Sequence, residues 1–207
     1  MSKPLQPNLG KIIFIIGGAR SGKSSFALGE ASRITGKKAY IATAEALDEE
    51  MRERIEKHKR QRERNWDTYE ESIRLCELIK EIGHKYEAIV IDCLTLWLSN
   101  LLHAGFSIDI EIEQFISSLR TLRTSMKTMP HQHPFSPRQI GPNAEVNGEC
   151  GYFQTVCIIS NEVGMGIVPE NELARKFRDI AGILNQKIAE AADEVYMMVA
   201  GMPVKVK

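Results

Sequence analysis

The 207-residue chain has little that would direct it to a membrane or to nucleic acid. Lys plus Arg and Asp plus Glu number 27 each, so the overall charge gives no reason to expect a polyanionic partner. The apolar runs at 12–16 and 88–91 are far shorter than the ~20 residues of a membrane-spanning helix, and the first residues lack the apolar segment of a signal peptide. We therefore expect a cytoplasmic protein with no membrane span and no nucleic-acid partner.

Cysteine is also scarce, and none of it forms a C-x-x-C pair. The four cysteines are Cys76, Cys93, Cys150 and Cys157. Their scatter in a cytosolic chain predicts reduced, mostly buried thiols rather than a zinc site or disulfides. The length suits one well-buried α/β core and is short for two, so we expect a single domain over 1–207.

The most informative segment present is a phosphate loop that follows the apolar run 11–16. The loop consists of Gly17, Gly18, Ala19, Arg20, Ser21, Gly22, Lys23 and Ser24, which matches G-x-x-x-x-G-K-S. Its glycines let the backbone aim N–H groups at phosphate oxygens, Lys23 reaches the β/γ phosphates, and the Ser24 hydroxyl can bind Mg²⁺. A glycine-rich turn without ligand is the alternative, but the flanking strand and helix favour a nucleoside triphosphate site.

Short β-rich runs alternate with amphipathic stretches along the chain. Strands are predicted at 11–16, 39–42, 88–92, 156–160 and 194–199, and helices at 22–35, from 48, at 70–82, 94–102 and 110–126, and from about 170. This alternation predicts an α/β fold of the P-loop NTPase, RecA-like kind, with a mostly parallel sheet flanked by helices. The phosphate loop, Thr43, Asp92 and 161–162 then meet at the carboxyl ends of the strands, where such sheets bind ligands.

The last long helix carries an apolar stripe that predicts a core face. Its members are Leu173, Phe177, Ile180, Ala181, Leu184, Ile188 and Ala191. Before it, the segment 127–153 is rich in Pro, Gly and polar residues, which predicts an irregular surface insertion. Within the insertion, His131 and His133 lack a nearby third ligand, so solvated histidines are expected and a metal role is the alternative.

Asp92 is the second candidate site residue because it closes an apolar strand beside the phosphate loop. An acid at this place in P-loop enzymes holds Mg²⁺, often through water, so that the metal can bridge phosphate oxygens. The alternative is that Asp92 caps the helix that starts at Leu94, and both roles can hold together.

A histidine is the third candidate. Met51, Ile55, His58 and Arg62 share one face of the helix predicted from Asp48. A neutral imidazole can attack phosphorus at physiological pH and hold the nucleotide as a phosphoramidate, although such histidines are more often hydrogen-bonded core or rim residues. The basic residues nearby could steady triphosphate oxygens or could form an ordinary solvated helix face.

Six blocks of sequence together resemble one known family. They are Gly17 to Ser24, Tyr40 to Thr43, Asp48 to His58 with Trp66 beyond it, Asp92 to Asn100, Ser160 to Glu170, and Leu173 to Gly182. In this order they resemble the bifunctional adenosylcobinamide kinase/adenosylcobinamide-phosphate guanylyltransferase family of cobalamin biosynthesis. The resemblance covers nearly the whole chain.

The resemblance implies two successive reactions. A nucleoside triphosphate, ATP or GTP, phosphorylates the aminopropanol hydroxyl of adenosylcobinamide. GTP then transfers GMP to that phosphate through a covalent GMP-histidine intermediate, which gives adenosylcobinamide-GDP and pyrophosphate. The family's nucleophile corresponds here to His58, and Mg²⁺ is the implied cofactor. The resemblance also implies a homo-oligomer, a trimer with sites near subunit boundaries.

The resemblance further implies a set of nucleotide contacts beyond the phosphate loop. They are Ala42, Thr43, Lys59, Arg60, Gln61, Arg62, Glu70 and Asp92, with Ser24 and Asp92 at the metal. For 161–167 two interpretations stay open: a polar loop closing over nucleotide or corrinoid, or a strand-to-helix connection whose glycines permit the turn. The cluster of Arg175, Arg178 and Asp179 is equally compatible with an ordinary helix surface.

Two other function classes remain open from sequence. A single-activity small-molecule kinase would use the same loop and Asp92 without needing His58. A nucleotide-dependent switch would need a segment that responds to the γ-phosphate, and the sequence has no obvious one. The 127–153 segment is longer than the corresponding connection in compact relatives, so it either contacts the corrinoid or is dispensable.

Overall fold

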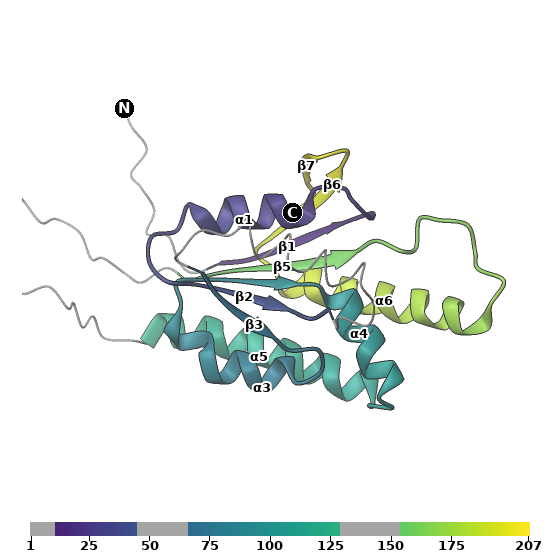
Figure 1. Ribbon diagram of the computed structural model, residues 1–207, viewed down its shortest axis with the longest axis horizontal. Helices are drawn as coiled ribbons and strands as arrows, with labels where there is room; N and C mark the ends of the chain where they lie inside the picture. Colours follow the sequence, from purple (N-terminus) through teal and green to yellow (C-terminus); the bar gives the residue numbers. More distant parts are fainter. Residues whose placement is uncertain (1–10, 45–65, 129–153) are drawn as a thin grey trace, which may run out of the picture.

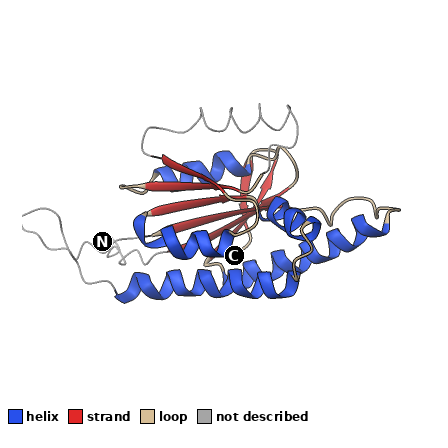
Figure 2. Cartoon of the chain, turned by 60° about the horizontal axis from the view of Figure 1, so that its bottom comes forward, coloured by secondary structure: helices blue, strands red, loops and turns tan. Residues whose placement is uncertain are grey.

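A computed structural model describes residues 11–44, 66–128 and 154–207, and these form a seven-stranded sheet with helices on both faces (Figures 1 and 2). The strands are β1 (Lys11–Gly17), β2 (Lys38–Ala42), β3 (Trp66–Glu70), β4 (Ala88–Asp92), β5 (Thr155–Asn161), β6 (Glu194–Val199) and β7 (Met202–Lys205). Their order is β3-β2-β4-β5-β1-β6-β7. All neighbouring pairs are parallel except β6 and β7, which form an antiparallel hairpin. The predicted α/β class with a mostly parallel sheet is confirmed.

The helices divide unequally between the two faces of the sheet, as Figure 1 shows. They are α1 (Lys23–Ser32), α3 (Leu75–Ile82), the 3-10 turn η1 (Gly83–Lys85), α4 (Leu94–His103), α5 (Ile108–Thr128) and α6 (Glu172–Ala191). Helix α1 packs Ala27 and Ala31 onto one face, where small side chains allow a close approach. The other face carries the larger cluster, in which the fully buried Trp97 of α4 packs on Phe115 of α5.

The central strands are apolar on both sides because helices cover both faces. In β1, residues 12–15 are all at most 3% exposed, and β5 is buried from Thr155 to Ser160. Strands of this kind give continuous apolar runs instead of an alternating pattern. Parallel pairing brings the carboxyl ends of β1, β5, β4, β2 and β3 to a single edge of the sheet.

Two strands differ from the sequence prediction. The helix predicted over 70–82 starts only at Leu75, because 66–70 forms the edge strand β3 next to β2. Aromatic and β-branched residues favour a strand there, and the Glu71 carboxylate then accepts hydrogen bonds from the Ile73 and Arg74 N–H groups (3.0 and 2.7 Å) just before α3. The second difference is β7, which the sequence analysis does not predict.

The apolar stripe of α6 is buried only in part. Ala181, Leu184 and Ile188 are fully buried, whereas Leu173 is 65% exposed, so its predicted place in the core is wrong for the single chain. The reason is geometric: the first part of α6 extends beyond the carboxyl edge of the sheet (Figure 1), so no strand lies beneath its first turn.

Several predictions fall outside the described residues. They include the helix from Asp48, with His58 and Lys59 to Arg62, and the insertion beyond Thr128. Of the four cysteines, Cys76, Cys93 and Cys157 are buried free thiols, as predicted, and Cys150 lies in the insertion. Within 11–44, 66–128 and 154–207, no helix is both long and apolar enough to span a bilayer.

Candidate active site

The phosphate loop joins β1 to α1 at the carboxyl edge of the sheet. Gly22 takes the N-cap position of α1 in the left-handed region, with φ of 94°, and it has no side-chain cap. The first-turn N–H groups of the helix therefore point into the loop, where helix ends favour anions. Gly18, Ala19 and Arg20 form the exposed crown of the loop, and Ser21 and Lys23 are buried below it.

Lys23 lies beneath this loop with its ammonium group already pointed at the loop backbone. Its Nζ donates to the carbonyl oxygens of Gly17 (2.9 Å) and Gly18 (2.6 Å). These bonds hold a positive charge at the base of the loop, although the side chain is only 8% exposed. A triphosphate can take over such donors because phosphate oxygens accept charge-assisted bonds more strongly than carbonyls.

Asp92 and Ser24 meet although 68 residues separate them in the sequence. The Ser24 hydroxyl donates to Asp92 Oδ2 at 2.6 Å. Tyr40, which the sequence analysis does not assign to the site, donates its hydroxyl to the same oxygen at 2.7 Å. A hydroxyl and a carboxylate side by side at the foot of a phosphate loop are hard oxygen ligands of the kind that Mg²⁺ prefers. The donor set thus fits this cation.

Thr43 supports the backbone that follows Asp92. Its hydroxyl accepts from the Cys93 N–H and donates to the Cys93 carbonyl, both at 2.7 Å, and its own N–H donates to the Asp92 carbonyl at 3.0 Å. The side chain is fully buried, so its hydroxyl acts within the protein. Burial, together with the negative charge of Asp92, raises the pKa of the Cys93 thiol, which therefore stays protonated.

Ala42 and Glu70 lie at the ends of β2 and β3, further from the phosphate loop than Asp92 at the end of β4. In the sheet register, Ala42 lies between Glu70 on one side and Asp92 on the other. Glu70 is exposed on the edge strand, one strand further from the phosphate loop than Ala42. The structure therefore brings Gly17 to Ser24, Thr43 and Asp92 to the same edge, as the sequence analysis predicts, and it adds Ala42 and Glu70, which the sequence analysis named only as implied nucleotide contacts.

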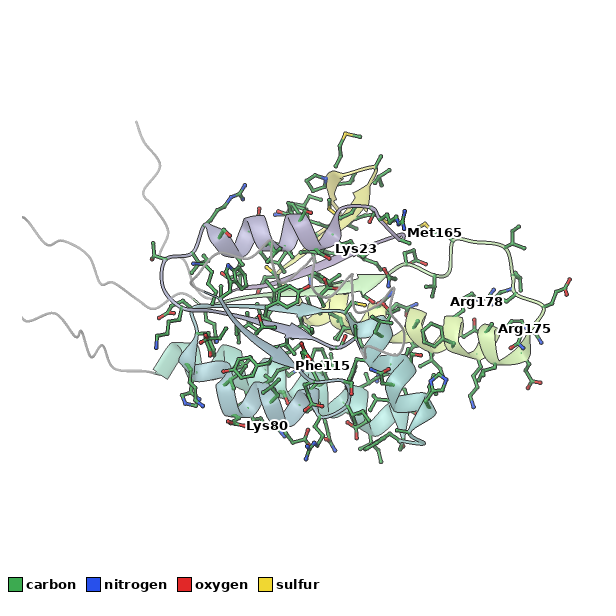
Figure 3. The ribbon with its side chains drawn as sticks, in the orientation of Figure 1. Lys23, Lys80, Phe115, Met165, Arg175 and Arg178 are labelled. Atoms are coloured by element: carbon green, nitrogen blue, oxygen red, sulfur yellow. The ribbon has the colours of Figure 1, made fainter. Side chains whose placement is uncertain are left out.

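The segment that follows β5 is hydrogen-bonded to the phosphate loop at its first residues. The Glu162 N–H donates to the Gly17 carbonyl at 3.0 Å, and the Asn161 side chain donates to Thr95 Oγ1 at 2.9 Å. Beyond this anchored start, Met165 and Ile167 are 76% and 97% exposed. Figure 3 shows Met165 at the same end of the molecule as Lys23. The exposed part of this loop is thus more apolar than the expected polar loop.

The charged residues Arg175, Arg178 and Asp179 in the first part of α6 make two different kinds of contact. Arg175 donates to the carbonyls of Pro169 (3.0 Å) and Glu170 (2.5 Å), so it fastens the end of the loop to the helix. Arg178 pairs with the adjacent Asp179 at 3.0 Å, an ordinary surface ion pair. Figure 3 shows both arginines on the part of α6 that extends from the sheet.

The β6–β7 hairpin forms a wall of the phosphate loop that the sequence analysis misses. The Gly201 N–H donates to the Ser21 carbonyl at 3.1 Å. A Cβ on Gly17 would lie 2.7 Å from the Met198 carbonyl oxygen, so contact with this hairpin is one reason for a glycine at position 17. The hairpin turns at Ala200 and Gly201, with φ of 50° and 84°, and the glycine here is the sequence signal that favours such a turn before β7.

Comparison with known proteins identifies the family. The family model described as cobinamide kinase / cobinamide phosphate guanyltransferase matches residues 13–130 and 145–206. Two similar proteins are each named bifunctional adenosylcobalamin biosynthesis protein CobU. The one from Escherichia coli strain K12 is 37% identical over 203 residues, covering 95% of this chain and 99% of that protein. The one from Salmonella typhimurium strain LT2 is 39% identical over 200 residues, with the same coverage of 95% and 99%.

A third relative, from Pseudomonas aeruginosa, is named bifunctional adenosylcobalamin biosynthesis protein CobP. It is 35% identical over 195 residues, which cover 93% of this chain and 95% of that protein. The chain therefore belongs to the cobinamide kinase / cobinamide phosphate guanyltransferase family, which confirms the resemblance read from its motifs and its assignment as a bifunctional kinase and nucleotidyltransferase.

Proposed function

We propose that the carboxyl edge of the sheet binds the triphosphate for two successive transfers to a corrinoid. In the first, ATP or GTP phosphorylates the aminopropanol hydroxyl of adenosylcobinamide. In the second, GTP transfers GMP to that phosphate, which gives adenosylcobinamide-GDP and pyrophosphate. The observation that carries the proposal is the hydrogen bond from Ser24 to Asp92 at the foot of the phosphate loop.

Both reactions build negative charge on a phosphate leaving group, and the loop supplies the groups that stabilise it. The N–H groups of the α1 first turn and the Lys23 ammonium group offer preorganised positive charge, which costs no reorganisation during the reaction. We propose that Ser24 and Asp92 hold Mg²⁺, Asp92 through water. When bound, the cation would neutralise charge on the phosphate oxygens.

For guanylyl transfer we assign the role of nucleophile to His58, which lies outside the described residues. Its neutral imidazole attacks the α-phosphorus of GTP, a P–N bond forms, and the bond to pyrophosphate breaks. The imidazolium then loses its one remaining ring N–H proton to solvent, and the ring takes a proton back when the histidine leaves. A phosphate oxygen of adenosylcobinamide phosphate displaces the histidine, so the GMP group passes on and His58 is regenerated.

The remaining nucleotide contacts are assigned by the family's motifs. We propose that Lys59, Arg60, Gln61 and Arg62 contact the triphosphate beside His58, and that the three cationic side chains among them neutralise its oxygens. Ala42, Thr43 and Glu70 line the nucleotide from the strand ends. Thr43 takes part through its backbone position, because its hydroxyl is bound to Cys93.

We also propose that the protein works as a homotrimer in the cytoplasm, where its triphosphate substrates are found. Exposed apolar side chains on the β5–α6 segment, including Ile167 and Leu173, support association with another copy of the chain. Light scattering after size-exclusion chromatography tests this: about three times the 23.3 kDa chain mass is expected, and a monomer would overturn it.

One labelling experiment tests the catalytic assignment. The wild-type protein, His58→Ala and the control His84→Ala, an exposed histidine of η1, are incubated with Mg²⁺ and GTP labelled at the α- or γ-phosphorus, then denatured. Acid-labile, base-stable label is expected from α-labelled GTP in wild type and His84→Ala only. If the wild-type protein retains no label but still phosphorylates adenosylcobinamide, it is a single-activity kinase; if His58→Ala retains the label, another residue is the nucleophile and the assignment of His58 is wrong.

A further inference from the structure

We infer that Tyr40 is a positioning residue for the metal-binding carboxylate: its hydroxyl holds Asp92 in one orientation beside Ser24. The inference rests on the proposed role of Asp92 in holding a divalent cation. Tyr40 has no assigned part in the reaction, and it acts here through Asp92 instead of touching nucleotide.

The sheet register places the three side chains on one face. Tyr40 of β2 pairs with Val90 of β4, two residues before Asp92. Alternate residues of a strand share a face, so Val90 and Asp92 point to the α1 side of the sheet, where Tyr40 also lies in the core. Ser24 approaches from the first turn of α1 on that same side. A diagonal neighbour on the adjacent strand is within reach of a side chain as long as tyrosine.

The hydrogen-bond pattern shows what each hydroxyl contributes. Tyr40 and Ser24 donate to the same oxygen, Oδ2 of Asp92, at 2.7 and 2.6 Å. Two donors on one oxygen resist rotation of the carboxylate about its Cβ–Cγ bond. Because Ser24 is itself a proposed metal ligand, its hydroxyl has to serve both the cation and Asp92. Tyr40 is not a proposed metal ligand, so its hydroxyl can stay hydrogen-bonded to Asp92 and hold the carboxylate throughout the reaction cycle.

The side chains that pack around Tyr40 fix the position of its hydroxyl group. The side chain is 3% exposed, and its ring packs edge-on against Trp66 with centroids 6.5 Å apart. A ring fixed in this way has lost its conformational freedom on folding, so it aims the hydroxyl without further entropic cost. The rest of this core cluster is mainly aliphatic, and a phenol is tolerated there because its polar end reaches the carboxylate.

The test is Tyr40→Phe, which removes one oxygen atom and keeps the packing against Trp66. Its matched control is Tyr86→Phe: the Tyr86 hydroxyl donates to Asp67 at the same 2.7 Å, but near the amino ends of the strands. Mn²⁺ affinity is measured by electron paramagnetic resonance with a non-hydrolysable GTP analogue present. Loss of a group that hydrogen-bonds a metal ligand typically lowers metal affinity about 10–100-fold. Because Asp92 is proposed to hold the cation through water, Tyr40→Phe is expected to weaken Mn²⁺ binding at the lower end of this range, about 10-fold. Tyr86→Phe is expected to leave it unchanged.

A third variant, Asp92→Asn, tests the proposed metal-binding role of Asp92, on which the inference about Tyr40 rests. If Asp92→Asn lowers Mn²⁺ affinity and Tyr40→Phe binds like wild type, the role of Tyr40 is wrong and the metal site stands. If Asp92→Asn also binds like wild type, the metal assignment itself fails. Steady-state kinetics add a second readout: Tyr40→Phe is expected to lower kcat of both reactions while KM for adenosylcobinamide stays the same. Loss of thermal stability with unchanged Mn²⁺ affinity would show a purely structural role and overturn the inference.

Discussion

The contact between the phosphate loop and the β6–β7 hairpin predicts that alanine is costly at Gly17 and almost neutral at the adjacent Gly18. A Cβ on Gly17 would lie 2.7 Å from the Met198 carbonyl oxygen and 2.9 Å from Ser21 Oγ, and the φ of Gly17 is +156°. A Cβ on Gly18 meets no described atom within 4 Å. Gly17→Ala therefore forces backbone against backbone, whereas Gly18→Ala adds a methyl group at the exposed crown of the loop.

The magnitude follows from the cost of overpacking. Extra atoms in a packed site typically cost about 1–3 kcal/mol, and an unfavourable φ adds about 1 kcal/mol, so Gly17→Ala is expected to cost about 2–4 kcal/mol. For a domain of this size that corresponds to a fall in Tm of about 4–16 °C. Because the Gly17 carbonyl accepts bonds from Lys23 and from the Glu162 N–H, its displacement should also weaken nucleotide binding.

Urea unfolding and calorimetric titration with a non-hydrolysable GTP analogue measure the two effects. Gly18→Ala is the matched control and is expected to change the unfolding free energy by less than about 0.5 kcal/mol, as exposed substitutions do. Equal destabilisation by the two variants, or a Gly17→Ala protein as stable as wild type, would refute the argument from the hairpin contact.

Three further predictions concern other parts of the fold. Burial opposes ionisation of Glu194, but hydrogen bonds from Lys205, Lys11 and Tyr196 outweigh burial and lower the pKa of the carboxyl group. The ionised Glu194 side chain therefore stabilises the fold above about pH 4, the ordinary pKa of a glutamate. This stabilisation is lost as the pH falls through the lowered pKa. Glu194→Gln should accordingly unfold more easily at pH 7, and a difference in unfolding free energy that persists unchanged at pH 3 would contradict this. Trp97→Phe should cost about 2–4 kcal/mol in urea unfolding, because Trp97 is fully buried and its Nε1–H donates to the Ile73 carbonyl at 2.9 Å. Ala200→Gly should raise the unfolding free energy by about 0.5–1 kcal/mol in the same assay, because Ala200 has a φ of 50°, and a destabilised variant would count against left-handed strain at this turn.

The sequence predicted most of the fold because the central strands are continuous apolar runs between strong helix and turn signals. The sequence prediction was wrong where the structure of a segment depends on the strands that lie beside it. Residues 66–70 form a strand because β2 offers them a free edge, and β7 forms because the Ala200-Gly201 turn folds the chain back on β6. Leu173 belongs to the apolar stripe of α6 by spacing, yet the sheet ends before it, and helical periodicity contains no information on where a sheet ends.

The sequence by itself determined the chemistry of the site: a phosphate loop, an acid at a strand end, and the family to which these motifs belong. These follow from residue types at short spacings, which are fixed by the covalent chain. Only the tertiary structure decided that Tyr40 and Ser24 share one oxygen of Asp92, and that the C-terminal hairpin packs on the phosphate loop. Such contacts join residues far apart in the sequence, and they depend on strand order and register, which are decided by the packing of the whole sheet.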